Sequence, residues 1–462
     1  MTLPESGAPW PPPERVAPYR EMRVDDAWYS GDRARLARVY DHHQTYAERR
    51  KLWGRRPNAE RHGQQEQRLH MPLPGDIART SADLLFADMP EIIVDDKATR
   101  DRLDVLLDEG QVQATLLGAA EQAAALSGVF LRVTWDRELA DRPLLTVCQP
   151  DGAVPEFRYG ITTVVTFWRE LSATEHVVFR HFERHEPGRI LHTLYEGTPD
   201  NVGRAVPLTE HPETAELVDS LDGDGVSIST GIRDLTAAYI PNMLPNRLHR
   251  GSPLGRSDFA KPLPDLFDAL DETWSSWMRD IREVWTSLRI PPTEDNGITL
   301  AQFAIRVEEH QRTAEATTRE AVQAAGYSAQ SFGLDRGGQA ITATEVDSRD
   351  ARSMVTRKKK AGYWRHSLTH MLHVLLQIDA SVFGQRITPL RPRVEFGDSV
   401  AESEQQTATT LDLLNRAGAV STKTKVKILH PEWDDDVQTE VDAILTETGA
   451  AALEPLQANV LL

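Results

Sequence analysis

The chain has 462 residues, of which 40% are hydrophobic and 26% are charged. This composition is typical of a globular protein, and the length corresponds to about three domains at roughly 150 residues each. Acidic residues outnumber basic ones by 70 to 52, which gives a net charge of −18. That balance argues against a chain whose whole surface binds nucleic acid, because such domains are usually basic.

The single cysteine, Cys148, excludes an intramolecular disulfide and a zinc site built on several cysteines. It is compatible with a reducing cytoplasm. No apolar run reaches the roughly 18 residues of a membrane-spanning helix, and residues 1–16 lack the pattern of a secretory signal. We therefore expect a soluble protein that stays in the compartment where it is made.

The first half of the chain is predicted to begin with an arm and to continue with helices and then strands. Residues 1–20 contain six prolines, which favour an extended arm. This arm is either a disordered tail or a segment that docks on a neighbouring subunit. Hydrophobic periodicity predicts helices at 32–46, 79–86 and 99–127, and strands at 91–94 and 129–134. Residues 144–240 are predicted to be mostly β, with strands at 161–168, 176–182 and 190–195 and a surface loop at 197–231.

Two long helices are predicted in the second half. Apolar residues recur every three or four positions from 264 to 290, where Pro264 suits a first helical turn and Pro291 ends the helix. A second helix is predicted from 343 to about 379, with Thr342 and Glu345 at the spacing of a capping box. The two helices would be roughly 40 and 55 Å long, against a mean globular helix of about 11–12 residues. No internal repeat is visible, so their length favours a subunit of an assembly.

The segment between these helices is predicted to form a compact excursion. It comprises a turn at 291–297, a short strand at 301–307, a polar helix at 308–325 and a glycine-rich loop at 333–339. The loop lacks the lysine and hydroxyl of a phosphate-binding loop, which leaves a flexible connector as the simplest interpretation. Beyond the second long helix, short helices are expected at 407–417 and 434–446.

No catalytic or metal-binding motif stands out. The sequence contains neither a G-x-x-x-x-G-K-[ST] loop nor a G-x-S-x-G nucleophile elbow. Three histidines, His366, His370 and His373, share one helical face but lack the glutamate of H-E-x-x-H, so we expect them to pack or to be exposed. His181 and His185 are four residues apart on a predicted strand, which places them too far apart for one metal ion.

Two charged segments have both a structural and a functional interpretation. Asp222 and Asp224 resemble part of a calcium loop, but the ligands at its first and last positions are missing, so an acidic surface loop is favoured. The second long helix carries a run of four cations: Arg357, Lys358, Lys359 and Lys360. This run is either a solvated helical face or a contact with DNA or an acidic neighbour. We expect a protein that is not an enzyme and that needs no metal and no cofactor.

The order of several short motifs resembles the portal protein of tailed double-stranded DNA bacteriophages, particularly the long-tailed group that infects Gram-positive hosts. The matching segments cover roughly residues 25–448 and are AWYSG at 27–31, DIARTSADLLF at 76–86 with Pro90, SGVFLRV at 127–133 with Asp136, Asn246 with Gly255 and Ser257-Asp258, RVEEH at 306–310, AGYSAQSFG at 325–333, TATEV at 342–346, and HPEW at 430–433 with Asp435.

The resemblance implies an α+β portal-type fold with a mixed α/β wing, a long α-helical stem with a small β clip, and an α-helical crown. After the arm at 1–20 it implies the following parts: a wing at 21–257, stem helices at 258–290 and 308–326, a clip at 291–307, a tunnel loop at 327–341, a tunnel helix and wing return at 342–398, a crown at 399–448 and a C-terminal tail at 449–462. The loop residues expected to face DNA are Gly333, Asp335, Arg336, Gly337, Gly338 and Gln339, and the cationic run at 357–360 is a further candidate.

By the same resemblance, the protein forms a ring, usually of twelve copies, at one capsid vertex of the virion after synthesis in the host cytoplasm. The ring is the channel for DNA packaging and ejection, and it nucleates capsid assembly. Its implied partners are the terminase large subunit, the head-tail connector or adaptor, the major capsid protein and the scaffold, with no membrane. An acidic channel would not trap a sliding phosphate backbone, while local cations could guide it. Two other classes stay open: another oligomeric phage structural or scaffold component, and a metal-dependent hydrolase.

Overall fold

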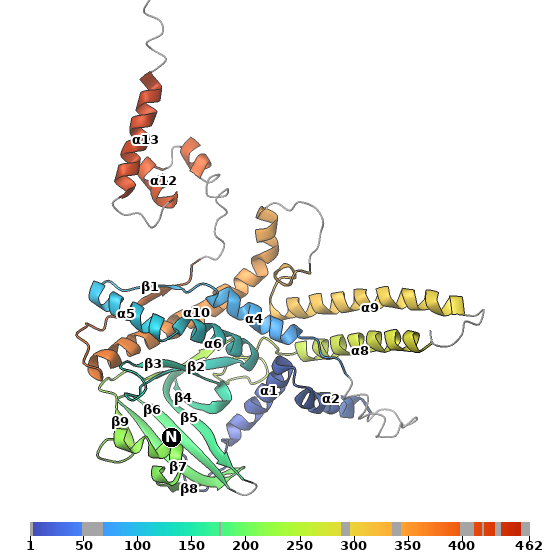
Figure 1. Ribbon diagram of the computed structural model, residues 1–462, viewed down its shortest axis with the longest axis horizontal. Coiled ribbons are helices and arrows are strands. Elements are labelled where there is room, and N and C mark those ends of the chain that lie inside the picture. Colours follow the sequence, from blue (N-terminus) through green and yellow to red (C-terminus); the bar gives the residue numbers. More distant parts are fainter. Residues whose placement is uncertain are drawn as a thin grey trace, which may run out of the picture. The chain divides into compact units, whose positions relative to one another are not determined.

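The computed structural model describes residues 3–48, 68–174, 177–287, 296–334, 343–397, 411–417, 420–429 and 436–453. The chain divides into two units. Unit 1 comprises Met1–Ala340 and Ser348–Gly397, and unit 2 comprises Ile341–Asp347 and Asp398–Leu462. The described parts are mixed α and β (Figure 1), as the α+β class requires. No helix that the structure describes is long and apolar enough to cross a membrane.

The N-terminal half of unit 1 starts with helices and ends in sheets. Its helices are α1 (Pro13–Ser30), α2 (Arg33–Glu48), α4 (Leu73–Phe86), α5 (Lys97–Glu109), α6 (Val112–Leu126) and the single turn α7 (Pro212–Ala215). Its strands are β1 (Glu91–Ile93), β2 (Gly128–Thr134), β3 (Leu144–Cys148), β4 (Ala153–Arg158), β5 (Ile161–Ala173), β6 (Val178–Glu186), β7 (Arg189–Thr198), β8 (Asn201–Val206), β9 (Ser227–Ser229) and β10 (Ala237–Pro241).

Three sheets organise these strands. The largest is an antiparallel meander in the order β4-β5-β6-β7-β8, with β9 paired to β7. A three-stranded sheet has the order β10-β2-β3, so a strand from far along the chain lies beside β2. The third sheet pairs β1 with β11 (Arg393–Glu395). Strand β11 follows the long helices in the chain, so this pairing joins the two halves of unit 1.

The second half of unit 1 is built on three long helices. They are α8 (Leu263–Ser287), α9 (Asn296–Ala325) and α10 (Ala343–Ser381), of which α10 begins with residues of unit 2. The first and third confirm the two long helices expected from periodicity. In unit 2, α12 (Thr422–Leu429) packs against α13 (Asp436–Leu453) through Val426, Val437 and Val441.

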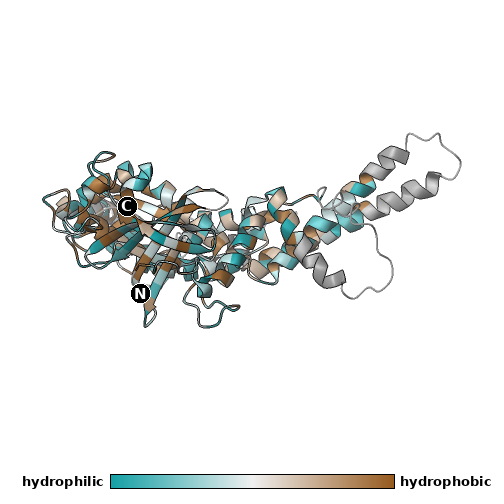
Figure 2. Cartoon of the chain, turned by 90° about the horizontal axis from the view of Figure 1, so that it is seen from below, coloured by the Kyte–Doolittle hydropathy of each residue, from teal (hydrophilic) through white to brown (hydrophobic). Residues whose placement is uncertain are grey.

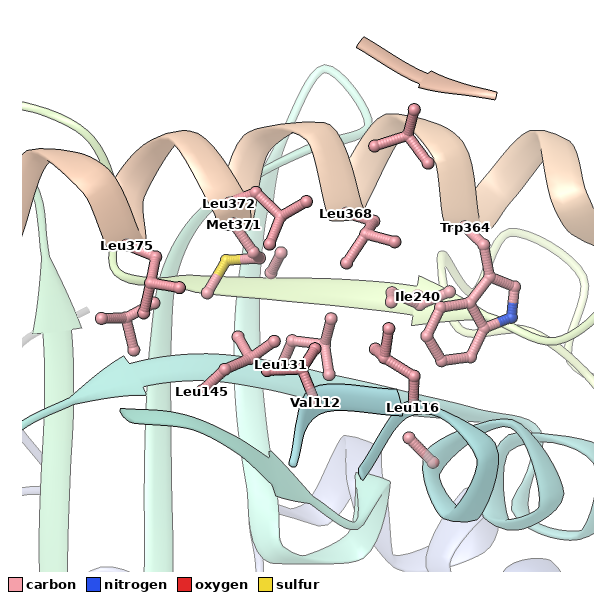
Figure 3. Close-up of a cluster of buried hydrophobic side chains, with 14 of the residues drawn as sticks. Val112, Leu116, Leu131, Leu145, Ile240, Trp364, Leu368, Met371, Leu372 and Leu375 are labelled. Atoms are coloured by element: carbon pink, nitrogen blue, oxygen red, sulfur yellow. The ribbon is translucent and has the colours of Figure 1, made fainter. Parts of the chain in front are cut away.

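The main hydrophobic core lies under α10. Its apolar residues repeat at helical spacing and meet α6 and the three-stranded sheet (Figure 3). The labelled members are Trp364, Leu368, Met371, Leu372 and Leu375 on α10, Val112 and Leu116 on α6, and Leu131, Leu145 and Ile240 on the strands. Burial of each such side chain is worth about 1.5–3 kcal/mol, so this face fixes the position of α10. Figure 2 shows hydrophobic and hydrophilic residues alternating along the described helices, as amphipathic packing requires.

Three expectations for local structure are wrong. The helix expected at 99–127 is divided into α5 and α6 at Gly110 and Gln111. Residues 301–307, expected to form the strand of a small clip, belong to α9. The alternation spans too few residues to outweigh the helix formers within and after the segment, such as Gln302, Arg306 and Glu308. The loop expected at 197–231 contains two strands, β8 and β9.

The N-terminal arm is shorter than expected and lies on its own chain. Helix α1 begins at Pro13, because proline at the first helical position loses no hydrogen bond. Before it, Trp10 is buried against Trp168 and Phe182, at ring-centroid distances of 5.5 and 4.7 Å. Pro9 pairs with Asn201 at the edge of the large sheet. In the residues described from 3 onward, the arm is therefore packed on the large sheet of its own chain rather than a disordered tail.

Candidate functional site

The most distinctive feature of unit 1 is the helical hairpin formed by α8 and α9. The two helices lie side by side and project from the sheets (Figure 1). At its base, Phe267 and Leu270 of α8 and Val322 of α9 are buried in one cluster with Trp28 of α1. Because α9 carries small side chains such as Ala314 on this face, the two helices can approach closely.

A buried carboxylate anchors α8 to the N-terminal helices. The Asp271 side chain is almost fully buried and accepts hydrogen bonds from the Tyr40 hydroxyl at 2.5 Å and the Met71 backbone N–H at 2.8 Å. His70 Nδ1 lies 2.9 Å from the same carboxylate. Burial, followed by the charge of Asp271, raises the pKa of Tyr40 far above its usual value, so the hydroxyl stays a donor. The anchor therefore fixes the hairpin against α2 and residues 70–71.

A second polar cluster joins the hairpin to α10, and we call it the junction: Ser81, Asp258, Tyr327 and Lys360. Lys360 is only 2% exposed. Its Nζ donates to Asp258 Oδ2 at 2.6 Å, Ser81 Oγ at 2.6 Å and Tyr327 Oη at 3.0 Å. Tyr327 Oη in turn donates to Asp258 Oδ2 at 2.7 Å. Four segments thus meet at one point: α4, the residues before α8, the residues after α9, and α10.

The junction is a structural cluster rather than a reactive one. Asn242 donates to Asp258 Oδ1 at 2.9 Å, so both carboxylate oxygens are satisfied. Burial lowers the pKa of Lys360, while the attraction of Asp258 acts in the opposite direction. Burial, followed by the charge of Asp258, raises the pKa of Tyr327 well above its usual value. All three N–H groups of Lys360 already donate hydrogen bonds, so none is left to bind a substrate. The cluster therefore holds the four segments in place.

The chain that follows α9 is bound to α10 by hydroxyl groups. Ser328 Oγ donates to Asp350 Oδ1 at 2.6 Å, and the Ser328 N–H donates to Ser353 Oγ at 2.9 Å. Thr356 Oγ1 donates to the carbonyl of Gly326 at 2.6 Å. The first part of the expected tunnel loop is therefore held on α10 at Gly326 and Ser328. Beyond it, Gly333 adopts the left-handed conformation at φ 66°.

The structure places the expected DNA-facing residues in three different settings. Gly333 follows the segment held on α10, whereas Asp335, Arg336, Gly337, Gly338 and Gln339 lie outside the described residues. In the cationic run of α10, Lys358 and Lys359 are exposed. Arg357 donates to the carbonyls of Leu84 at 2.5 Å and Gly397 at 2.8 Å, and Lys360 is the buried member of the junction. Only Lys358 and Lys359 of this run are exposed on the described chain for contact with another molecule.

The histidines that cluster in the sequence are not arranged to bind a metal ion in the described part of the chain. On α10, His370 contacts the carbonyl of Leu235 and His373 that of Pro389, so these two side chains serve different loops. On β6, His185 is bonded to Thr236 and Glu183. In the part of the chain that the structure describes, no group of three or more potential ligands is arranged to hold a metal ion.

Sequence reasoning missed the junction because its partners are far apart in the chain. Lys360 and Asp258 are separated by 102 positions. The available signal was indirect: Asp258 and Tyr327 both fall inside motifs that resemble portal proteins, and Lys360 precedes the buried Trp364 by about one turn on the same face of α10.

Comparison with known protein families gives a match over the second half of the chain. A family model described as phage portal protein, SPP1 Gp6-like, matches residues 229–452. This range contains the helical hairpin, α10 and three of the four junction residues. No curated protein matched the chain. The family match supports a phage portal protein.

Proposed function

We propose that the chain is the subunit of a ring of twelve copies at one capsid vertex, through which DNA enters during packaging and leaves during ejection. The observation that carries this proposal is the helical hairpin, which projects from the sheets within the matched range. A long hairpin needs neighbours to cover its sides, and identical hairpins side by side around an axis supply them. The host would belong to the Gram-positive group and the phage to the long-tailed group.

The charge of the hairpin fits a channel that DNA slides through. On the described part of α9, four exposed glutamates, Glu308, Glu309, Glu315 and Glu320, outnumber the two exposed arginines, Arg312 and Arg319. Carboxylates facing a bore repel phosphate and prevent DNA from binding tightly to the wall. In this arrangement the loop at 335–339, with Arg336 as its only cation, narrows the bore and contacts the phosphate backbone, and Lys358 and Lys359 are further contacts.

The proposed assembly acts with other proteins. The terminase large subunit would dock on the ring and supply the energy of packaging, because the chain has no phosphate-cradling loop of its own. The head-tail connector would later replace it, and the major capsid and scaffold proteins would surround the ring during assembly.

Electron microscopy of the purified protein, with native mass spectrometry, tests this proposal. We expect closed rings with a central hole and a mass of about twelve subunits. A monomer or compact dimer at all concentrations tried would contradict it. A closed oligomer without a hole would favour a different phage structural or scaffold component. Metal analysis of the purified protein addresses the remaining alternative, since a hydrolase would retain a stoichiometric ion.

A further inference from the structure

The turn between β4 and β5 exposes two large side chains, Tyr159 and Ile161. We call the turn, residues 158–161, the tip. Tyr159 is 94% exposed and Ile161 is 69% exposed. The Arg158 guanidinium carbon lies 5.8 Å from the centre of the Tyr159 ring. A tyrosine and an isoleucine at the end of a hairpin thus leave their apolar surface in water.

The backbone of the tip makes tyrosine an unusual choice. Tyr159 has φ 53° and Gly160 has φ 80°, the pattern of a tight turn that favours asparagine followed by glycine. Side chains with a Cβ are strained in this region unless they are asparagine or aspartate. Such outliers often mark functional positions, and tyrosine is enriched at the centres of protein interfaces.

A cavity of about 470 Å³ lies against the middle of α1, between Pro18 and Asp25. One wall is α1, with Met22 and Val24, and the other is the loop from Met243 to Arg256, which is closed by a β-bridge between its ends. The Asn246 side chain holds this loop by donating to the carbonyl of Gly255 at 2.8 Å.

The cavity combines apolar walls with unsatisfied hydrogen-bond donors. Leu254 and Phe259 are buried at its lining. Arg256 Nε and the Ser127 hydroxyl also line it, and both are buried without a hydrogen-bond partner in the described chain. Ser127 itself is only 6% exposed. Buried donors without partners are costly, so the cavity suits an occupant with an apolar body and an oxygen at its end. A tyrosine side chain has both.

The tip cannot reach the cavity of its own chain. Arg15 near the start of α1 donates to the carbonyl of Pro155, and Tyr19 one turn later donates to that of Ala153. As α1 runs from Arg15 toward the cavity, its partners on β4 therefore run from Pro155 to Ala153, away from the tip. The tip and the cavity lie in opposite directions along this paired helix and strand. A contact between them must join two copies, and contacts of this head-to-tail type close into rings when the rotation allows.

We propose that Tyr159 of each subunit inserts into the cavity between α1 and the loop 243–256 of the next copy of this chain. Its ring covers the apolar walls, and its hydroxyl oxygen accepts hydrogen bonds from Arg256 and Ser127. Arg158 comes to face Glu21, one of two acidic residues on the α1 wall. The inference rests on the proposed ring but adds which surfaces meet in it.

Disulfide trapping in the full-length chain tests this contact. Cys148, the single native cysteine, is first replaced by serine. Tyr159→Cys is then combined with Leu248→Cys, an exposed residue at the rim of the cavity. Mild oxidation should give a ladder of covalent oligomers on a non-reducing gel. The matched control pairs Leu248→Cys with Leu139→Cys, because Leu139 is 74% exposed but lies outside both surfaces; it should give no ladder.

Assembly measurements give a second, independent readout. Tyr159→Ala should raise the protein concentration needed for half-assembly at least about tenfold, as expected for an interface hot spot. Tyr159→Phe should have an intermediate effect, because it removes only the hydroxyl, and Leu139→Ala should have none. The melting temperature of the monomer should not fall in Tyr159→Ala, which rules out misfolding.

The outcomes separate the contact from the ring. If wild-type rings form while Tyr159→Ala assembles normally and the variant with both Tyr159→Cys and Leu248→Cys gives no ladder, the contact is wrong and the portal proposal stands. If wild-type protein stays monomeric, both are wrong.

Discussion

Replacing Lys360 by methionine should destabilise unit 1 more than any other single change in the cationic run. The side chain is buried and donates three hydrogen bonds, of which the one to Asp258 is an ion pair at 2.6 Å. Methionine has a similar length but no charge, so Asp258 is left as a buried carboxylate with only the hydroxyl of Tyr327 and the amide of Asn242. Removal of one partner of a buried pair typically costs about 3–5 kcal/mol.

The assay is urea unfolding at a protein concentration at which the chain is monomeric, followed by hydrogen exchange across residues 326–334. Lys359→Met is the matched control, because this side chain is exposed, and it should change the free energy of unfolding by less than about 0.5 kcal/mol. The double variant Lys360→Met with Asp258→Asn should recover much of the loss, since it leaves no unpaired charge. If Lys360→Met unfolds within about 0.5 kcal/mol of wild type, the junction is not desolvated and the reasoning fails.

Three further predictions concern pH, packaging and energy. Burial and the neighbouring His192 lower the pKa of His181 from 6.5 to about 4. The unfolded chain therefore binds a proton that the folded chain does not, and stability is lost as pH falls from 6.5 to 4, by about 3 kcal/mol at 1.36 kcal/mol per pKa unit; His181→Gln should flatten this part of the profile in thermal melts, and an unchanged slope would contradict it. Arg336→Ala, or Gly337→Pro with Gly338→Pro, should leave rings intact in electron micrographs but reduce the DNA packaged per particle; failure to assemble would show instead that the loop is a subunit contact. The protein alone should not hydrolyse ATP, and turnover that persists through stringent purification would overturn the assignment of packaging energy to a partner.

Local periodicity predicted the long elements well. The helix expected at 264–290 is α8 (Leu263–Ser287), and the helix expected from 343 to about 379 is α10 (Ala343–Ser381). In both, apolar residues recur over many turns, so that the pattern is unambiguous. The segment 301–307 has room for only a few repeats, and there helix propensity and the continuity of α9 decide the outcome.

Charge patterns proved much less informative than apolar ones. Arg357, Lys358, Lys359 and Lys360 look alike in sequence, yet two are exposed, one binds backbone carbonyls and one is buried. What separates them is the position of each on the helix relative to α4 and to residues more than 100 positions away. The exposure of Tyr159 could not be predicted either, because the sequence does not distinguish an exposed tyrosine from a buried one. Only the fold shows that this side chain lies at the end of a hairpin.

The junction also limits where the proposed tunnel loop can move. Tyr327 and Ser328 are bonded to Lys360, Asp350 and Ser353, so the chain directly after α9 is held on α10. Breaking any one hydrogen bond of such a buried network is costly, because the group that loses its partner stays unsatisfied in a low-dielectric interior. In the proposed channel, the residues bonded to α10 would therefore stay in place as DNA passes. Gly333 is the first residue beyond this segment with a left-handed backbone, and there is open space where its Cβ would lie. The hairpin and α10 would then stay rigid while the loop responds to the DNA.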